Sequence, residues 1–270
     1  MHRMKYDQAV ASSKSVPETS SFDIQAVSRV GQILTLFGPD TAELTAVEVS
    51  ERIGLNRTTA YRYCTSLVAA GILERGGERG TFALGPLLLR LGVQAIGRRR
   101  VVEIAPPYLA RLSTEARATA VLALWGATAP IVTLVHEDTS RTVVLTVRAG
   151  SQLDATSSQM RVFLAYHPDP HLLERVGATL SEPQRAELEA GVYLARRTGY
   201  STVTLPDGLF AAAAPVFDEH GICATIALLS ADQFGPASET PGLAALLEVA
   251  EAITAALSAG RGGHDLADVQ

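Results

Sequence analysis

The stretch SERIGLNRTTAYRYCTSLVAAGILERGGERGTFALG, residues 50–85, decides how this chain folds. Its middle part has the spacing of an amphipathic helix that begins after Asn56, a common N-cap residue, and runs to Gly71. The glycine-rich sequence that follows predicts a two-stranded hairpin, 72–75 and 81–84, which turns through Gly76 and Gly77. The expected inward face of the helix recurs at i, i+3, i+4, i+7 and i+8 and consists of Ala60, Tyr63, Cys64, Leu67 and Val68.

Two shorter helices are expected before this one. In the segment 44–54, Thr45 can cap a helix, Glu48 follows at the capping-box position, and Gly54 ends it. The segment 22–38 precedes it, and its apolar residues at helical spacing are Ile24, Val27, Val30, Ile33, Leu34 and Phe37. Three helices followed by a hairpin is the order of a winged helix-turn-helix.

The outward face of the long helix has the chemistry of a DNA-reading surface. Its residues are Arg57, Thr58, Thr59, Tyr61 and Arg62. Arginine can donate two hydrogen bonds to guanine, threonine offers a hydroxyl and a methyl group to thymine, and tyrosine can reach phosphate. The hairpin adds Arg75 and Arg79, which could contact phosphate or the minor groove. The alternative is a solvated helix face that binds nothing.

Charge is distributed unevenly along the chain. Residues 1–100 hold 13 Lys+Arg and 9 Asp+Glu, a balance of +4, whereas the remainder holds 10 and 19, a balance of −9. The net charge of −5 argues against a general polyanion binder. The asymmetry instead predicts an anionic partner for the first part and a neutral or small partner for the second.

The composition also bears on location. No apolar run reaches the roughly 20 residues of a membrane span, and the N-terminus lacks the continuous apolar core of a secretory signal. The two cysteines, Cys64 and Cys223, have no neighbours at metal-ligand spacing and suit a reducing compartment. We therefore expect a cytoplasmic protein with no membrane partner, no metal and no cofactor.

Beyond the hairpin, the pattern predicts a linker helix over 86–105 with Leu87, Leu88, Leu91 and Ile96 as its apolar stripe. The pair Pro106–Pro107 should interrupt it, which places a domain boundary near 98–106. The rest changes period: strands over 120–126, 131–138 and 142–150, helices over 171–199 with a break near Pro183, a hairpin around Asp218–Gly221 and a closing helix over 243–260. This order describes an α+β sheet domain covered on one face.

From about residue 24 to 258 the chain resembles the isocitrate-lyase-regulator (IclR-type) transcription factors of bacteria. The resemblance is carried by QAVSRVGQILTLF, LTAVEVSERIGLNRTTAYRYCTSLVAAGIL, GTFALGPLLLRLG, RTGYS and GLFAAAAPVFDEHGICATIALLS. It implies a winged helix-turn-helix DNA-binding domain (22–85), a linker helix that helps to dimerise the protein (86–105) and a GAF-like effector-binding domain (106–259), with flexible tails at 1–21 and 260–270. Such proteins usually act as homodimers or homotetramers on pseudo-palindromic operators in double-stranded DNA, more often as repressors than as activators.

The resemblance also implies a pocket over the sheet that binds a small organic effector. The resemblance places this pocket between a loop over 155–161 and the strands that contain FAAAAPV and IALLS. Carried over by position, its lining is Ser157, Ser158, Gln159, Ala213, Leu228 and Ser230, each of which could instead be an ordinary sheet residue. Three departures from the family pattern favour an apolar or aromatic effector. Met160–Arg161 replaces a small-residue run, only Asp207 remains of an acidic cluster, and Trp125 replaces a polar turn residue unless it is simply part of the core.

These features favour a ligand-responsive DNA-binding regulator. A second hypothesis is a small-molecule sensor whose winged helix mediates protein contacts. A third, an enzyme, would need acid–base pairs such as those around His136 and His220, but both are expected at strand ends or turns where polar residues are common, and no catalytic motif accompanies them. We therefore predict that the protein is not an enzyme.

Overall fold

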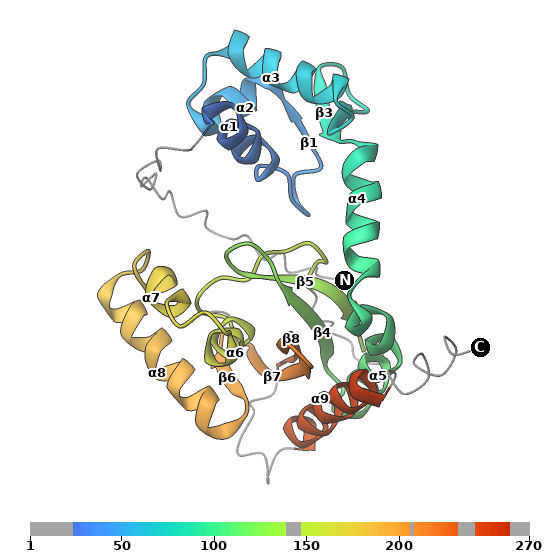
Figure 1. Cartoon of the computed structure of the whole chain (residues 1–270), viewed down its shortest axis with the longest axis vertical. Coiled ribbons are helices and arrows are strands. Elements are labelled where there is room, and N and C mark those ends of the chain that lie inside the picture. The colour runs from blue at the N-terminus through green and yellow to red at the C-terminus, as the bar shows by residue number, and fades with distance from the viewer. Residues whose placement is uncertain (1–23, 139–146, 206–207, 232–240, 260–270) are drawn as a thin grey trace, which may run out of the picture. The chain divides into compact units, whose positions relative to one another are not determined.

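The computed structural model describes residues 24–138, 147–205, 208–231 and 241–259 (Figure 1). The chain divides into two compact units, one comprising the residues up to Phe37 together with Glu43–Gly85, and the other comprising Gly38–Ala42 and the chain from Pro86 onward. The expected tails, Asp207 and most of the strand expected over 142–150 lie outside the described residues.

The first unit is a small helical domain with a three-stranded antiparallel sheet in the order β1-β3-β2. Its elements are α1 (Gln25–Leu34), β1 (Glu43–Thr45), α2 (Ala46–Ile53), α3 (Arg57–Ala69), β2 (Leu73–Arg75) and β3 (Thr81–Leu84). The predicted helices and hairpin are confirmed, whereas β1 was not predicted. The core of this unit is formed by Ile33, Leu44, Val49, Ala60, Cys64, Leu67, Leu73 and Phe82.

The start and end of α2 follow the sequence prediction closely. The Thr45 hydroxyl accepts a hydrogen bond from the Glu48 backbone N–H at 3.2 Å, and the Glu48 carboxylate accepts one from the Thr45 N–H at 2.8 Å. Gly54 ends the helix with φ +67°, in the left-handed region that glycine adopts without steric cost. The capping box therefore fixes where the helix-turn-helix begins.

The apolar pattern of α1 overestimates its contact with the core. Ile24 and Val27 are 68% and 65% exposed, whereas Ile33 is fully buried. Ile24 precedes the first helical residue, and only the side of α1 that carries Ile33 and the half-buried Val30 and Leu34 packs against the other helices. Only part of the apolar pattern of α1 therefore contributes to the core.

Removal of the cap of α3 is expected to destabilise the first unit. The Asn56 side-chain oxygen accepts a hydrogen bond from the Thr58 N–H at 2.9 Å. Asn56→Ala should lower the free energy of unfolding by about 1 kcal/mol, because the N–H loses its partner. Urea denaturation followed by circular dichroism measures this loss. Asn56→Asp keeps the acceptor and should be close to wild type, so an equal loss in both variants would contradict the capping role.

The second unit is built on a five-stranded antiparallel sheet in the order β5-β4-β8-β7-β6. Its strands are β4 (Thr119–Trp125), β5 (Pro130–His136), β6 (Ser201–Thr204), β7 (Phe210–Asp218) and β8 (Gly221–Ser230). Its helices are α4 (Pro86–Gly97), α5 (Arg100–Ala116), α6 (Ser158–Tyr166), α7 (Leu172–Gly177), α8 (Glu182–Thr198) and α9 (Pro241–Ala259). The hairpin around Asp218–Gly221 and the closing helix are confirmed; β6 and α6 were not predicted.

The pair Pro106–Pro107 does not break the chain where the sequence suggested. Pro106 and Pro107 lie inside α5, and the interruption falls instead between Gly97 and Arg100. A proline inside a helix removes one i→i−4 hydrogen bond. Here the helix continues because Ala105 and Leu109, which flank the pair, are buried in the core. The break expected near Pro183 is confirmed, because α7 ends at Gly177 and Pro183 lies in the first turn of α8.

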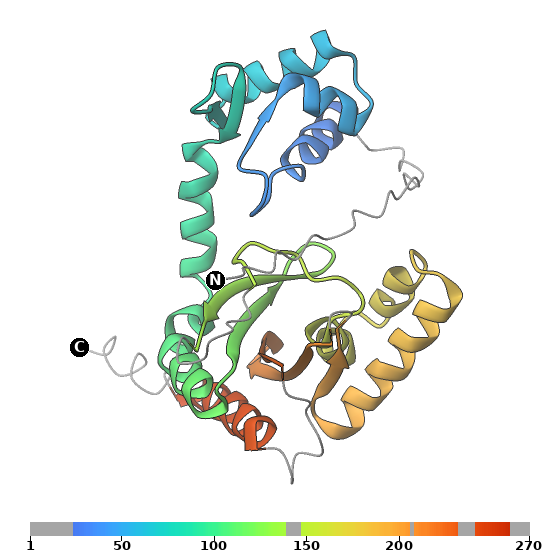
Figure 2. The ribbon, with the colours of Figure 1, turned by 180° about the vertical axis from the view of Figure 1, so that it is seen from behind.

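Helices cover both faces of the sheet, which corrects the expectation of one covered face. Helices α5 and α9 lie side by side against one face, where their apolar residues form a core with alternate residues of β4, β7 and β8 (Figure 1). Helix α6 packs against the opposite face through Val162, and α8 packs on α6 (Figure 2). Strands covered on both faces lose the apolar–polar alternation of a half-exposed sheet, so the pattern did not reveal the second layer.

Helix α9 is long and apolar enough to cross a membrane by length and composition, but its buried residues, such as Leu246 and Ile253, belong to the core beside α5.

Cys64 is fully buried, and burial raises the pKa of its thiol. Burial also raises the pKa of Cys223 to about 12, and its Sγ lies 3.4 Å from the Val216 carbonyl oxygen. Both thiols are therefore protonated at neutral pH.

Candidate functional site

The outward side of α3 carries every residue that the sequence predicted to read DNA from this helix. Arg57, Thr58, Thr59, Tyr61 and Arg62 are all exposed. The opposite side packs into the core of the first unit through Ala60, Cys64 and Leu67. The helical period thus separates residues that hold α3 in place from residues that can reach a partner.

The first turn of α3 is suited to an anion. The N-terminal backbone N–H groups of a helix and its dipole both favour negative charge. Arg57 lies in this turn, and its guanidinium is 3.8 Å from the Glu51 carboxylate, with both side chains more than half exposed. Such an exposed ion pair contributes little free energy. Arg57 can therefore exchange Glu51 for a phosphate or a base edge at small cost.

The exposed side chains of Arg75 and Tyr61 meet beside the buried ring of Phe82. The Arg75 guanidinium carbon lies 4.8 Å from the ring centroid of Phe82 and 5.9 Å from that of Tyr61. The two rings meet edge to face at 6.3 Å. Cation–π and aromatic contacts of this kind hold a side chain in one orientation. Arg75 therefore joins β2 to α3, a structural task that the sequence did not indicate for this predicted DNA-contact residue.

The turn between β2 and β3 presents Arg79, the second predicted wing residue, to solvent. The turn closes through a hydrogen bond from the Gly76 N–H to the Thr81 carbonyl at 3.0 Å, and Gly80 has φ +89°. The carboxylate of Glu43, from β1, accepts hydrogen bonds from the Gly77 N–H at 2.8 Å and from the Thr81 hydroxyl at 2.5 Å. Sequence reasoning missed Glu43, because these partners lie 34 and 38 residues away and no local pattern links them.

The loop expected around residues 155–161 is instead the start of α6. Ser157 is its N-cap, and its hydroxyl accepts a hydrogen bond from the Met160 N–H at 3.1 Å. Ser158 and Gln159 are buried in the first turn, and the Gln159 amide donates to the Thr225 hydroxyl of β8 at 3.0 Å. The predicted effector residues Ser157, Ser158 and Gln159 thus lie beside the sheet, but on a helix.

The sheet separates the predicted effector residues of β7 and β8 onto opposite faces. Ala213 lies with Ala227 on the face that packs against Val162 of α6. Leu228 belongs to the core beside α5 and α9, and Ser230 shares its face because strand residues alternate by two. The expectation that Leu228 and Ser230 line one pocket with Ala213 was wrong, by a register shift of one residue. Thr225 and Ala227 are the β8 residues on the α6 side.

Trp125, at the end of β4, lies on the α6 side among other aromatic rings. Its ring centroid is 5.4 Å from that of Phe163 and 5.2 Å from that of His167. It is half-buried and packs on the cluster between α6 and α8. Trp125 is therefore both part of a core and partly accessible, so the two alternatives posed by the sequence are not exclusive.

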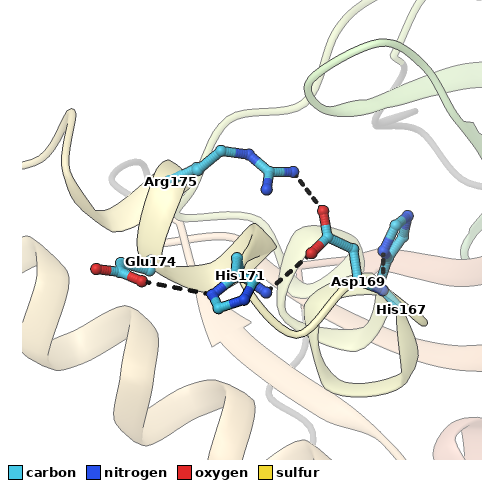
Figure 3. Close-up of polar contacts among 5 residues, drawn as sticks. All are labelled: His167, Asp169, His171, Glu174 and Arg175. Carbon is cyan, nitrogen blue, oxygen red and sulfur yellow. Dashed lines mark hydrogen bonds and ion pairs between the residues drawn. The ribbon is translucent and has the colours of Figure 1, made fainter.

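The residues after α6 hold His167 in its orientation (Figure 3). His167 Nδ1 accepts a hydrogen bond from the Asp169 N–H at 3.1 Å, and the Asp169 carboxylate accepts from the Arg175 guanidinium at 2.6 Å. Burial lowers the pKa of His167, whereas the hydrogen bond from Arg175 lowers the pKa of Asp169. A neutral imidazole that donates only through Nε2 therefore faces Trp125. The ion pair of Asp169 and Arg175 holds Asp169 in place, and the Asp169 N–H in turn fixes the His167 ring beside Trp125.

Arg161, one of the departures from the family pattern, is nearly buried between α6 and α8. Its guanidinium contacts the Glu187 carboxylate at 2.7 Å, and its Nε is buried without a partner. A Cβ at Gly191 would lie 2.6 Å from Arg161 Cδ, so glycine is needed there for the two helices to approach. Arg161 therefore joins α6 to α8.

The acid–base pair expected around His220 lies at the turn between β7 and β8. The His220 side chain is 82% exposed, with Nε2 3.4 Å from the Glu219 carboxylate. His136 ends β5 and is also exposed. Both positions are strand ends or turns, as the sequence suggested, and both side chains are open to solvent.

Comparison with known proteins agrees with this architecture. The family model of the IclR helix-turn-helix domain matches residues 26–77, which span α1 to the start of the wing turn. The HTH-type transcriptional regulator Rv1719 of Mycobacterium tuberculosis is 31% identical over 107 residues, which cover 40% of this chain and 40% of that protein. The regulator BhcR of Paracoccus denitrificans is 27% identical over 210 residues, which cover 73% of this chain and 74% of its own.

A solved structure resembles the chain over most of its length. The IclR homolog of Microbacterium hydrocarbonoxydans, crystallised in complex with 4-hydroxybenzoate, superposes with a TM-score of 0.69 and 23% identity. The match covers 86% of this chain and 98% of that one. At this identity the likeness establishes the α+β fold of the two units.

Proposed function

We propose, because this chain belongs to the IclR family of helix-turn-helix transcriptional regulators, that it binds double-stranded operator DNA through α3 and the wing. The observation that carries this proposal is the exposed side of α3. It places Arg57 and Arg62 with two threonines at the N-terminal turns of the second helix of a helix-turn-helix. These turns are the part of a recognition helix that meets base edges in the major groove.

We further propose that the protein works as a homo-oligomer. Helix α4 has no buried residue, and it exposes Leu89, Leu91, Val93 and Ile96, each by at least 45%. An exposed apolar helix favours association with a second copy. A dimer would present two recognition helices to two half-sites, so that affinity depends on both being engaged.

The effector that we propose is a small apolar or aromatic molecule bound on the α6 side of the sheet. Trp125 with its ring neighbours, the small side chain of Ala213 and the Gln159 amide support this choice. The 4-hydroxybenzoate bound by the Microbacterium homolog is of the same chemical class. We propose that effector binding shifts the spacing of the two recognition helices and so releases DNA, as in a repressor acting in the bacterial cytoplasm, with no enzymatic step.

Selection of bound duplexes from a random pool tests the DNA-binding proposal. We expect a palindrome whose half-site spacing reports the oligomer, and an affinity that falls steeply with salt. Failure to enrich any sequence, or binding that does not depend on salt, would favour a sensor whose winged helix contacts protein.

The effector proposal has its own test, because Trp125 is the only tryptophan of the chain. Titration with a substituted benzoate should change tryptophan fluorescence and release the selected duplex. A short hydrophilic acid such as pyruvate serves as the comparison. If pyruvate produced both effects and benzoates neither, the apolar or aromatic assignment would be wrong.

A further inference from the structure

We infer that Glu43 is a positioning residue for DNA binding: its carboxylate fixes the wing turn from β1, without touching the DNA. The inference rests on the proposed function, in which the wing contacts the duplex. Glu43 lies on β1, which pairs with β3 so that Glu43 is opposite Ala83. Its side chain reaches past this pair to the turn, where it binds the Gly77 N–H and the Thr81 hydroxyl.

The turn is built around this carboxylate. A Cβ at Gly76 would lie 2.3 Å from a Glu43 carboxylate oxygen and 2.2 Å from the Thr81 hydroxyl oxygen, so only glycine leaves room for the contact. The Glu78 N–H also points to Glu43, at 3.5 Å. The turn that carries Arg79 is therefore held at its start and its end by a single side chain from a third strand.

The negative charge of Glu43 disfavours DNA binding, in contrast to the positioning role of its carboxylate. A carboxylate beside a DNA-binding surface repels phosphate, so electrostatics alone would favour its removal. Hydrogen bonds from Thr81 and Gly77 lower the pKa of Glu43, so the group stays ionised at neutral pH. The carboxylate thus opposes DNA electrostatically while it organises the turn that presents Arg79.

The loss of the negative charge should raise the affinity for DNA, whereas the loss of the hydrogen bonds to the turn should lower it. The two effects therefore predict opposite changes in affinity for the substitution Glu43→Ala. We expect Glu43→Ala to weaken binding of the selected duplex about tenfold, because hydrogen bonds to a charged group are lost and the turn is released. The matched control is Glu74→Ala, which removes the same charge from an exposed position on β2, the strand on the other side of β3, where Glu74 is also opposite Ala83. It should leave affinity unchanged or strengthen it. If Glu43→Ala also left affinity unchanged or strengthened it, the inference would be overturned.

Salt dependence separates positioning from direct contact. A residue that neutralises a phosphate contributes about one unit to the slope of log affinity against log salt. Arg79→Ala should therefore reduce the slope. In Glu43→Ala the Arg79 side chain is still present and can reach its phosphate once the loosened turn is ordered, so affinity should fall while the slope is unchanged. Binding to an unselected duplex of the same length should change less than binding to the selected one. An equal loss on both duplexes would indicate general damage to the domain and would contradict the inference.

A double-mutant cycle keeps the test valid if Glu43→Ala folds poorly. Glu43→Gln keeps the side-chain volume and one oxygen acceptor, and Thr81→Val removes the hydroxyl donor without a change of charge. Because these residues share a hydrogen bond, their effects on affinity should be non-additive, whereas additive effects would contradict the inference. If wild-type protein selects no duplex, the proposed function fails; if it does and these variants bind as wild type, only the role of Glu43 fails.

Discussion

Arg62→Ala is expected to weaken binding of the selected operator by about 10- to 100-fold. The side chain is exposed in the second turn of α3, on the side that the core residues Ala60 and Cys64 leave free for a partner. An arginine that binds a guanine edge contributes about 1–3 kcal/mol of discrimination. A gel-shift titration against the selected duplex and its single-base variants measures both the affinity and the base at which specificity relaxes.

The control for this variant is Arg185→Ala, which removes the same charge from α8. Arg185 pairs with Glu189 at 2.8 Å on the surface of the second unit, so its loss should leave operator affinity within about twofold of wild type, given the small contribution of exposed pairs. Arg62→Lys should recover only part of the affinity, since lysine cannot form the two parallel hydrogen bonds. Equal affinity of the Arg62→Ala variant and wild type would remove this residue from the DNA interface.

Leu228→Ala is expected to cost about 2–5 kcal/mol of the stability of the second unit, the usual cost of truncating a fully buried leucine. Leu228 is 0% exposed and packs with α5 and α9. Chemical denaturation followed by circular dichroism measures the loss. Because the residue faces away from α6, the fluorescence response of Trp125 to an effector should keep its midpoint at temperatures where the variant is folded.

The neighbouring leucine provides the matched comparison. Leu229 is half-buried on the opposite face of β8, so Leu229→Ala should cost less stability than Leu228→Ala. The register assignment would be contradicted if Leu228→Ala left stability intact and abolished the effector response.

Local signals in the sequence predicted the first unit well. The cap at Asn56, the capping box of Thr45 and Glu48, and the period that buries Cys64 and Leu67 all act within a few residues. What the sequence did not reveal depends on pairing over distance. Strand β1 and the contact of Glu43 with the wing exist only once β1 meets β3. The stack of Arg75 on Phe82 likewise requires the folded hairpin.

The second unit shows the same limit at the effector site. Alternation by two correctly placed Leu228 and Ser230 on one face, but alternation does not say which helix covers that face. The loop expected over 155–161 came from the family resemblance, whereas these residues begin helix α6, whose burial depends on contacts such as that of Gln159 with Thr225. The proline pair remains helical because neighbouring side chains are buried, a tertiary effect that overrides local preference.

The protonated state of both thiols makes the chain suitable for site-specific labelling. Thiolate is the form that reacts with maleimides, and with a pKa of about 12 the Cys223 thiol is almost wholly protonated at neutral pH. Cys64 is also enclosed beneath α3. A cysteine introduced at an exposed position such as Thr59 would therefore react alone. In the proposed homodimer, a spin label at that position would report the distance between the two copies of α3 as effector is added.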